Sequence, residues 1–233
     1  MVKLLIVGSL NMDMVADVDH TPLTGETILT REITLIPGGK GANQAYAAGK
    51  LKADVTMLGA VGGGEDDYGN TLLENLTKAG VHVENVIKRK HTATGMAFIT
   101  VNKEGDNSIV VISGANATMS VKDIDFGRKL IENADIVLLQ MEIPVDSGDI
   151  RRAGSVPGFG VVWDCKNHGH YRADGRYDCG GRCFHGGGSR QICRGKDLCE
   201  AASFANRVAS IVVTRKGAQS SIPTLEEVLA ESF

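Results

Sequence analysis

The stretch Gly38–Ala45, GGKGANQA, holds the residues whose types and spacing are best suited to ligand chemistry. Glycine tolerates positive φ and lets a ligand approach the bare backbone. The helical pattern that follows would offer unpaired N–H groups at its N-terminus, which favour anionic or hydroxyl-rich ligands. Lys40 adds a charge and three donors, and Asn43 adds a donor and an acceptor. The spacing also fits an ordinary glycine-rich turn with Asn43 as the helix cap, and it is not a Walker loop, because GxxxxGK[ST] is absent.

A second polar pair, Asn11 and Asp13, follows the apolar run at residues 3–8, which predicts a buried strand ending at Gly8. Open α/β sheets bind ligands beyond the carboxyl ends of their strands, so this pair is a candidate binding site. Asp13 also fits an ordinary turn residue. Alternation at residues 14–19 and 27–36 predicts two further strands. Because they lie too close together to be linked by helices, we expect a small side sheet or lid.

The rest of the N-terminal part alternates between strand and helix patterns. We expect helices at 41–51, from about 67 to 78 and at 121–132, strands at 54–61 and 136–139, and a hairpin of 94–101 with 107–113. This order predicts an α/β fold with a doubly wound, mostly parallel sheet and a small β lid.

Composition excludes several classes of partner. The net charge of −3 and the lack of a basic cluster argue against nucleic acid. No apolar run approaches the roughly 20 residues that span a bilayer, and no signal peptide is recognisable. The chain therefore reads as a soluble cytoplasmic protein without a membrane partner. All five cysteines, an odd number, lie in the last third, and the spacing of Cys179 and Cys183 beside three histidines matches no standard zinc pattern.

Several motifs together resemble the ribokinase family of sugar kinases, over about 1–147 and 196–230. They are Asn11-x-Asp13, the turn at 22–26, the GGKGANQA stretch, Gly114-Ala115-Asn116, Gln140-Met141-Glu142 and the run VTRKGAQ at 213–219. One departure is a lengthened glycine turn at 61–69, which an exposed loop should tolerate.

The resemblance implies transfer of the γ-phosphoryl group of ATP to the 5-hydroxyl of a pentose, D-ribose, with Mg²⁺ and a monovalent cation such as K⁺. The substrate-binding residues it implies are Asn11, Asp13, Gly39, Lys40, Gly41, Asn43 and Glu142. Asn206 would lie beside the adenine, unless it is simply a solvated helix residue. The oxygens implied for the cation are those of Val212, Arg215, Gly217 and Ser221. The family's lid strands shield the site and often pair between subunits, which implies a homodimer through the lid, here about 12–36 and 94–113.

Residues 148–195 depart from the family. They contain no leucine, 12 of the 29 glycines and four of the five cysteines, and no helical or alternating pattern persists there. We therefore divide the chain into a sugar-binding part at 1–147, an anomalous segment at 148–195 that is frame-shifted or disordered, and an incomplete nucleotide and cation side at 196–233. No catalytic residue is identifiable, because the family's Asp loop is missing near 176–184.

A shifted reading frame accounts for part of this gap. The codons of residues 176–188, regrouped by one base, can encode the missing loop with its aspartate. We interpret 148–194 as read in a shifted frame and shortened, with the cysteine–histidine cluster as a by-product. Kinase activity is then expected to be impaired. The alternatives are a non-catalytic sugar-binding remnant and a kinase of another sugar or nucleoside.

Overall fold

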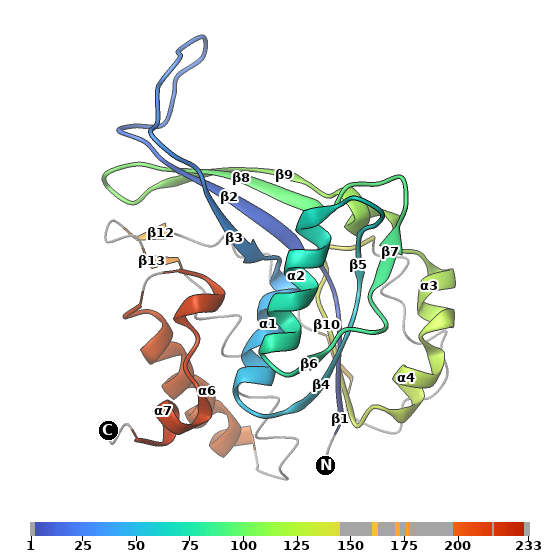
Figure 1. Ribbon diagram of the computed structural model, residues 1–233. Coiled ribbons are helices and arrows are strands. Elements are labelled where there is room, and N and C mark those ends of the chain that lie inside the picture. The colour runs from blue at the N-terminus through green and yellow to red at the C-terminus, as the bar shows by residue number, and fades with distance from the viewer. Residues whose placement is uncertain are drawn as a thin grey trace.

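The computed structural model describes residues 3–144, 160–162, 171–172, 176–177, 198–215 and 217–230. Its centre is a five-stranded sheet in the order β11-β10-β1-β4-β6, and every pairing in it is parallel (Figure 1). The strands are β1 (Lys3–Val7), β4 (Asp54–Leu58), β6 (Val81–His82), β10 (Ile136–Leu139) and β11 (Gly160–Val162). The doubly wound α/β prediction is confirmed.

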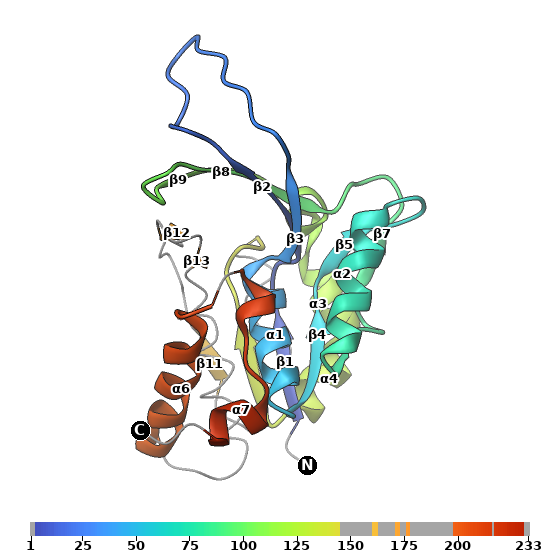
Figure 2. The same ribbon diagram turned by 60° about the vertical axis from the view of Figure 1, so that its left-hand side comes forward.

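Alternate residues of β1 supply two separate cores. Leu4 and Ile6 face one side and pack with α1 (Lys40–Lys50) and α2 (Asp67–Lys78). Leu5 and Val7 face the other side, where α3 (Val121–Phe126) and α4 (Arg128–Asn133) cover the sheet. Because both faces are covered, β1 and β10 read as continuous apolar runs. Figure 2 shows the helices on both sides of the central strands.

A second sheet stands above the first, in the order β3-β2-β8-β9 (Figure 1). Its strands are β2 (Asn11–Asp17), β3 (Thr34–Gly38), β8 (Gly95–Val101) and β9 (Asn107–Ile112). The predicted lid and its hairpin are confirmed. The strand predicted at 27–36 is mostly wrong, since only its last three residues lie in β3. Residues 18–33 instead form a loop that projects away from the body and has no neighbouring strand to complete a ladder.

Two other predicted elements are interrupted at glycines. The strand expected at 54–61 breaks at Gly59, where a Cβ would lie 2.6 Å from the carbonyl oxygen of Gly8. Its continuation, β5 (Ala60–Gly62), leaves the main sheet and pairs with β7 (Ile87–Arg89). The helix expected at 121–132 breaks at Gly127 into α3 and α4. In each case the chain must turn to follow a neighbouring element.

The C-terminal part packs against the outer side of α1. The helix α6 (Leu198–Val212), the short turn η4 (Gln219–Ser221) and α7 (Leu225–Ala230) surround a core that includes Ala47 and Leu51. Within 148–195 the structure describes only β11 and the short pair β12 (Tyr171–Arg172) and β13 (Arg176–Tyr177), strands that no alternating pattern predicts. The rest of that segment, including the cysteine–histidine cluster, lies outside the described residues. In the described ranges, no helix has the length and apolarity needed to cross a membrane.

Candidate functional site

The site lies at the carboxyl ends of β1 and β10, which are neighbours in the sheet. From β1 the chain proceeds to β4 on one side, and β10 lies on the other, so this is the point where the strand order reverses. Such switch points form the ligand crevice of open α/β sheets. Here the loop after β1 meets the loop after β10. Ser9 donates to Oε1 of Gln140 from its backbone N at 3.2 Å, and its Oγ lies 3.0 Å from the same oxygen.

The glycine loop places the N-terminus of α1 directly on the end of β1. Gly39 is the N-cap, with φ of 89°, which only glycine adopts readily. A Cβ on Gly41 would lie 2.7 Å from the backbone N of Ser9. We expected these glycines to make room for a ligand. At Gly41 it is the chain's own backbone that needs the space. The helix begins at Lys40 rather than Gly41, and the predicted cap, Asn43, is a helix residue.

Lys40 and Glu142 form an ion pair that joins the start of α1 to the loop after β10, with Nζ 2.8 Å from Oε1. Their side chains are 19% and 31% exposed, so the pair is shielded on most sides but open to a ligand. The other carboxylate oxygen, Oε2, accepts from Oγ of Ser9 at 2.8 Å. Two of the predicted substrate residues, Lys40 and Glu142, are therefore brought together, and Ser9 holds Glu142 in position.

Asn11 and Asp13 lie on β2 with one residue between them, and so on the same face of the strand. They are 6% and 5% exposed. The Asp13 carboxylate leans over Gly38, where it occupies the space that a Cβ would need. The pair thus lies beside the beginning of the glycine loop, as the sequence predicted.

Asn116 holds the turn between β1 and β2. It lies in the short helix η1 (Gly114–Thr118), and its Oδ1 accepts from the backbone N of Leu10 at 3.0 Å. Its Nδ2 donates to the carbonyl oxygen of Leu10 at 2.9 Å and to Oδ1 of Asn11 at 2.8 Å. Asn116, Ser9 and Gln140 were not assigned functions from the sequence, although Asn116 and Gln140 lie in motifs that carry the resemblance.

Asn43 is fully buried, and its Oδ1 accepts from Nε2 of Gln219 at 2.8 Å. Oε1 of Gln219 in turn accepts from Nδ2 of Asn75, on α2. Asn43 therefore has a structural partner as well as its predicted position in the loop. Gln219 is another residue to which sequence reasoning gave no function.

Asp66 fixes the side of the site formed by α2 and β8. As the N-cap of α2 it accepts from the backbone N of Gly69 at 2.9 Å, and it also accepts from the backbone N of Thr94 at 2.6 Å. Burial raises the pKa of Asp66, but these hydrogen bonds outweigh it and hold the pKa below its usual value. The carboxylate thereby anchors the residue that precedes Gly95 and the start of β8.

The residue predicted to contact the adenine lies in the middle of α6, and the residues predicted to bind the cation lie at the end of α6 and after it. Asn206 is exposed on α6. The Val212 carbonyl accepts from the backbone N of Arg215 at 3.1 Å, and the Arg215 guanidinium pairs with Glu227 at 2.8 Å. Gly217 has φ of 99°, and Ser221 is buried with its Oγ bonded to the Ala218 carbonyl. The expected catalytic loop near 176–184 is outside the described residues, except for the backbone of β13.

Comparisons with known proteins identify the family to which the chain belongs. The sequence model of the pfkB family carbohydrate kinases matches residues 1–149 and 181–225. A ribokinase of Bacillus subtilis is 43% identical over 147 residues, which are 63% of this chain and 49% of that protein. The chain therefore spans about half the length of the curated relatives it matches.

Two solved structures have the same fold. The ribokinase of Thermotoga maritima has a TM-score of 0.80 at 28% identity, over 99% of this chain and 99% of that one. The Arabidopsis thaliana ribokinase complexed with ribose and ATP has a TM-score of 0.77 at 25% identity, over 98% of each. The second range of the family match begins at residue 181, inside the segment that departs from the family's pattern.

Proposed function

Because the chain belongs to the pfkB family of carbohydrate kinases, we propose that it is a ribokinase-type kinase whose N-terminal part binds D-ribose. The observation that carries the proposal is the convergence of Asn11, Asp13 and the Lys40–Glu142 pair at the switch point of the sheet. Carboxylates and a carboxamide, packed against an apolar sheet and a lid, form the mixed polar and apolar lining that sugar hydroxyls and ring carbons need.

The residues of the site divide the work of binding. The Asp13 carboxylate accepts hydrogen bonds from hydroxyl groups, and charge assistance makes these bonds stronger than neutral ones. Glu142 offers further acceptor capacity, while Lys40 balances its charge. The Gly38–Gly39 segment brings backbone groups next to Asp13, so that a sugar held by the carboxylate also contacts the loop. These contacts orient the acceptor hydroxyl, and orientation is a large part of catalysis in phosphoryl transfer.

The proposed nucleotide side is less complete. ATP supplies the phosphoryl group, and Mg²⁺, held largely by the phosphates, neutralises charge during transfer. In the described ranges, no three or more His, Cys, Asp or Glu side chains lie close enough together to hold a metal ion. We therefore assign no protein residue to Mg²⁺. Backbone carbonyls are suitable ligands for K⁺, and we assign such a site to Val212, Arg215, Gly217 and Ser221, of which Gly217 has a left-handed conformation.

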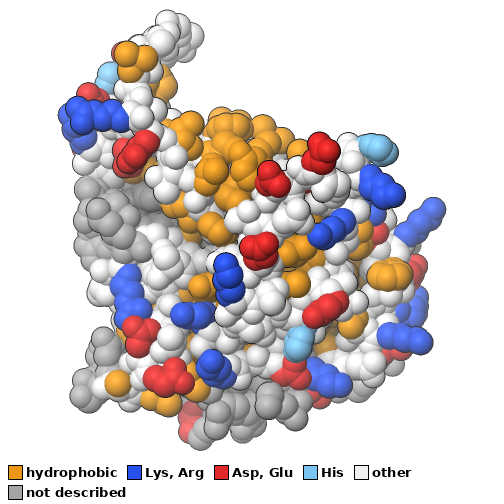
Figure 3. Space-filling view, in the orientation of Figure 1, with side chains coloured by type: hydrophobic (Ala, Val, Ile, Leu, Met, Phe, Trp, Pro, Cys, Tyr) orange, Lys and Arg blue, Asp and Glu red, His pale blue; other side chains and the backbone are white. Residues whose placement is uncertain are grey.

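We further propose that the lid binds a second copy of the chain. Its exposed face carries contiguous apolar side chains from β8 and β9: Phe98, Val110 and Ile112, which are between 42% and 65% exposed. Figure 3 shows the hydrophobic surface gathered over this sheet. Exposed β-strands of this kind are usually covered by a partner.

Two measurements test the proposed function. Isothermal titration of the whole chain with D-ribose should give saturable heats, and a coupled assay measures how much ribose-dependent ATP turnover remains without the family's aspartate loop. Titration of arabinose, fructose and adenosine in parallel identifies a related kinase of another substrate. Absence of binding to any of these sugars and nucleosides would refute the proposal. Binding without turnover would make the chain a sugar-binding remnant.

A further inference from the structure

The hydrogen-bonding direction of Asn11 can be deduced from the backbone of Leu10. The oxygen and the nitrogen of a carboxamide are distinguished by the hydrogen bonds that each can make. The backbone N of Leu10 can only donate, and therefore the Asn116 atom 3.0 Å from it must be Oδ1. The Nδ2 group of Asn116 then faces the Leu10 carbonyl oxygen, at 2.9 Å.

The same Nδ2 group also faces the side chain of Asn11, at 2.8 Å. This NH₂ group can only donate, and it has one hydrogen for the Leu10 carbonyl and one for Asn11. The Asn11 atom that it meets must therefore be the oxygen. Asn116 is 1% exposed, so its side chain is buried from bulk solvent. The Nδ2 group of Asn11 consequently points elsewhere. Within the described part of the chain it donates to no residue, and it is not among the buried side-chain atoms that lack a partner, so it is accessible to a ligand.

We infer that Asn116 is a positioning residue for substrate recognition: it makes Asn11 an obligate hydrogen-bond donor toward the sugar. Asp13, on the same face of β2, is an obligate acceptor. The site then presents one donor and one acceptor, which fits two neighbouring hydroxyls, one accepting and one donating. This inference rests on the proposed function for the identity of the sugar, but the orientation of Asn11 does not depend on it.

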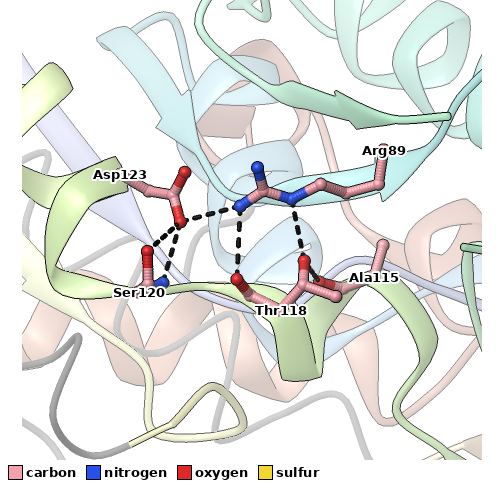
Figure 4. A network of polar contacts seen from close by, with 5 residues as sticks. All are labelled: Arg89, Ala115, Thr118, Ser120 and Asp123. Atoms are coloured by element: carbon pink, nitrogen blue, oxygen red, sulfur yellow. Dashed lines mark hydrogen bonds and ion pairs between the residues drawn. The ribbon is translucent and has the colours of Figure 1, made fainter. Parts of the chain in front are cut away.

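Arg89 clamps the turn η1, in which Asn116 lies. Figure 4 shows the contacts of Arg89 with Thr118 and Asp123. Nε of Arg89, on β7, donates to Oγ1 of Thr118 at 2.8 Å, and Nη2 donates to the Thr118 carbonyl at 3.2 Å. Thr118 Oγ1 donates to the Ala115 carbonyl at 2.7 Å, which closes the turn around Asn116. Nη2 of Arg89 also pairs with Asp123 at 2.7 Å. Both ends of the turn are thereby fixed to the body of the protein.

Gly95 closes the other side of the Asn11–Asn116 contact. A Cβ on Gly95 would overlap both Oδ1 of Asn11 and Nδ2 of Asn116. Gly95 does not have positive φ, so an alanine there is compatible with its backbone. Gly95→Ala should therefore disrupt the pair by steric pressure without changing either asparagine, and it gives a second variant should Asn116→Ala fail to fold.

The test uses the full chain with Asn116→Ala, Asn116→Asp and Gly95→Ala, and with Asn133→Asp at an exposed site on α4 as the control. Ribose affinity, measured by titration calorimetry, should fall about 10-fold or more in the first three, the equivalent of one lost hydrogen bond. The control should bind like the wild type. Equal ribose affinity in all of them would overturn the inference.

Fluorinated sugars separate positioning from a merely structural effect. Fluorine accepts a hydrogen bond weakly but cannot donate one, so at the hydroxyl facing Asn11 the wild type should prefer the fluoro analogue to the deoxy analogue. Asn116→Asp replaces the donor by an acceptor and should let the Asn11 carboxamide rotate, which abolishes that preference. If Asn116 had only a structural role, Asn116→Asp would lower the melting temperature and leave the preference for the fluoro analogue unchanged.

Nuclear magnetic resonance tests the inference without any sugar. The side-chain amide signals of Asn11, assigned by their loss in Asn11→Ala, should move in Asn116→Ala and stay in place in the Asn133 control. Unmoved signals would overturn the inference. If the wild type binds no ribose but the Asn11 signals still move in Asn116→Ala, the proposed function is refuted and the inferred orientation of Asn11 stands.

Discussion

Nε2 of Gln219 donates to Oδ1 of Asn43 at 2.8 Å, although the two residues are 176 positions apart in the chain. Both are buried, and Asn75 donates to the oxygen of the same Gln219 carboxamide. One side chain in the C-terminal turn therefore fastens the first turns of α1 and the side of α2. The turn proposed for the cation is thus bonded directly to the helix that carries the glycine loop.

Replacement of Gln219 by leucine should destabilise the protein by about 1–3 kcal/mol, because the buried side chain of Asn43 and the half-buried side chain of Asn75 each lose a hydrogen-bond partner. Denaturant unfolding followed by circular dichroism measures this change. Ser203→Ala, at an exposed position of α6, is the control and should unfold like the wild type. An unchanged midpoint for Gln219→Leu would mean that the contact contributes nothing to the docking of the C-terminal part.

Local patterns were sufficient to predict the elements that pack in a regular layer. The apolar run of β1 and the helical period of α2 were both recognised, and they occur with boundaries close to those expected. The breaks at Gly59 and Gly127 were not, because they depend on how closely another segment approaches. Residues 27–33 alternate like a strand but have no neighbouring strand, and alternation alone does not supply one.

The predicted site was recognised through residues that stand close together in sequence, such as Asn11 with Asp13. The residues that hold this pair in position were not recognised from the sequence. Asn116 contacts Leu10 across 106 positions and Ser9 contacts Gln140 across 131, and such pairs are visible only once the parallel register of β1 and β10 is known. Polar groups that are conspicuous as motifs could therefore be predicted, whereas the buried carboxamides that orient them could not.

Asp13→Asn should weaken ribose binding by about 10- to 150-fold, the equivalent of the roughly 1.5–3 kcal/mol contributed by a hydrogen bond to a charged group. The substitution keeps the shape of the side chain but replaces one acceptor oxygen by a donor. Asp17→Asn, at the exposed end of the same strand, leaves the site untouched and should bind ribose normally. If both variants give the same titration heats as the wild type, Asp13 is not part of the sugar site.

Lys40→Met should weaken ribose binding less than Asp13→Asn, because the ammonium acts mainly through Glu142 and is partly solvated. The effect should be largest at low ionic strength, where the Lys40–Glu142 attraction is least screened. Titrations at two salt concentrations check this. Lys78→Met, on the outer end of α2, is the control. A Lys40→Met variant that binds as weakly as Asp13→Asn would instead place the ammonium on the sugar.

The Arg89–Asp123 pair should make stability depend on pH in the acid range. Burial raises the pKa of Asp123, but hydrogen bonds from Arg89 and Ser120 outweigh it, so the pKa in the folded protein lies below the ordinary 3.8. The folded state therefore favours the ionised carboxylate, and this contribution is present in full above the unfolded pKa. It is lost as the pH falls from about 4 through the lowered folded pKa.

Asp123→Asn should remove that part of the pH dependence. It should cost about 1.5–3 kcal/mol of unfolding free energy at pH 7, where the charged hydrogen bonds are formed, and less at pH 3. Thermal melts of wild type and variant between pH 3 and 7 measure the difference. Asp125→Asn, two residues away in an exposed ion pair with Arg128, is the control and should change little. A difference in unfolding free energy between wild type and Asp123→Asn that stays constant from pH 3 to pH 7 would contradict the assignment of this pH dependence to Asp123.

Phosphoryl transfer by the 233-residue chain should be slower by several orders of magnitude than in a chain with the family's aspartate loop. A general base typically contributes about 10²- to 10⁴-fold, and a single anion-hole donor about 10²- to 10³-fold. As the sequence stands, no Asp follows a glycine–alanine loop near 176–184, and Asp178 is flanked by Tyr177 and Cys179. We therefore expect ribose to bind while ATP turnover with saturating ribose stays near the background rate.

Two further experiments on the gene distinguish the possible causes of the low turnover. Sequencing of the coding DNA across codons 145–197 tests the shifted frame directly, and a version with that frame restored should regain the aspartate. It should recover turnover only if the shortened region is also rebuilt, because the loop needs a sheet and a helix to position it. The recovered rate should be lost again on Asp13→Asn, which ties it to the sugar site. Robust ribose-dependent turnover by the unaltered chain, abolished by Asp13→Asn, would place the base elsewhere and end the frame-shift interpretation of the missing activity.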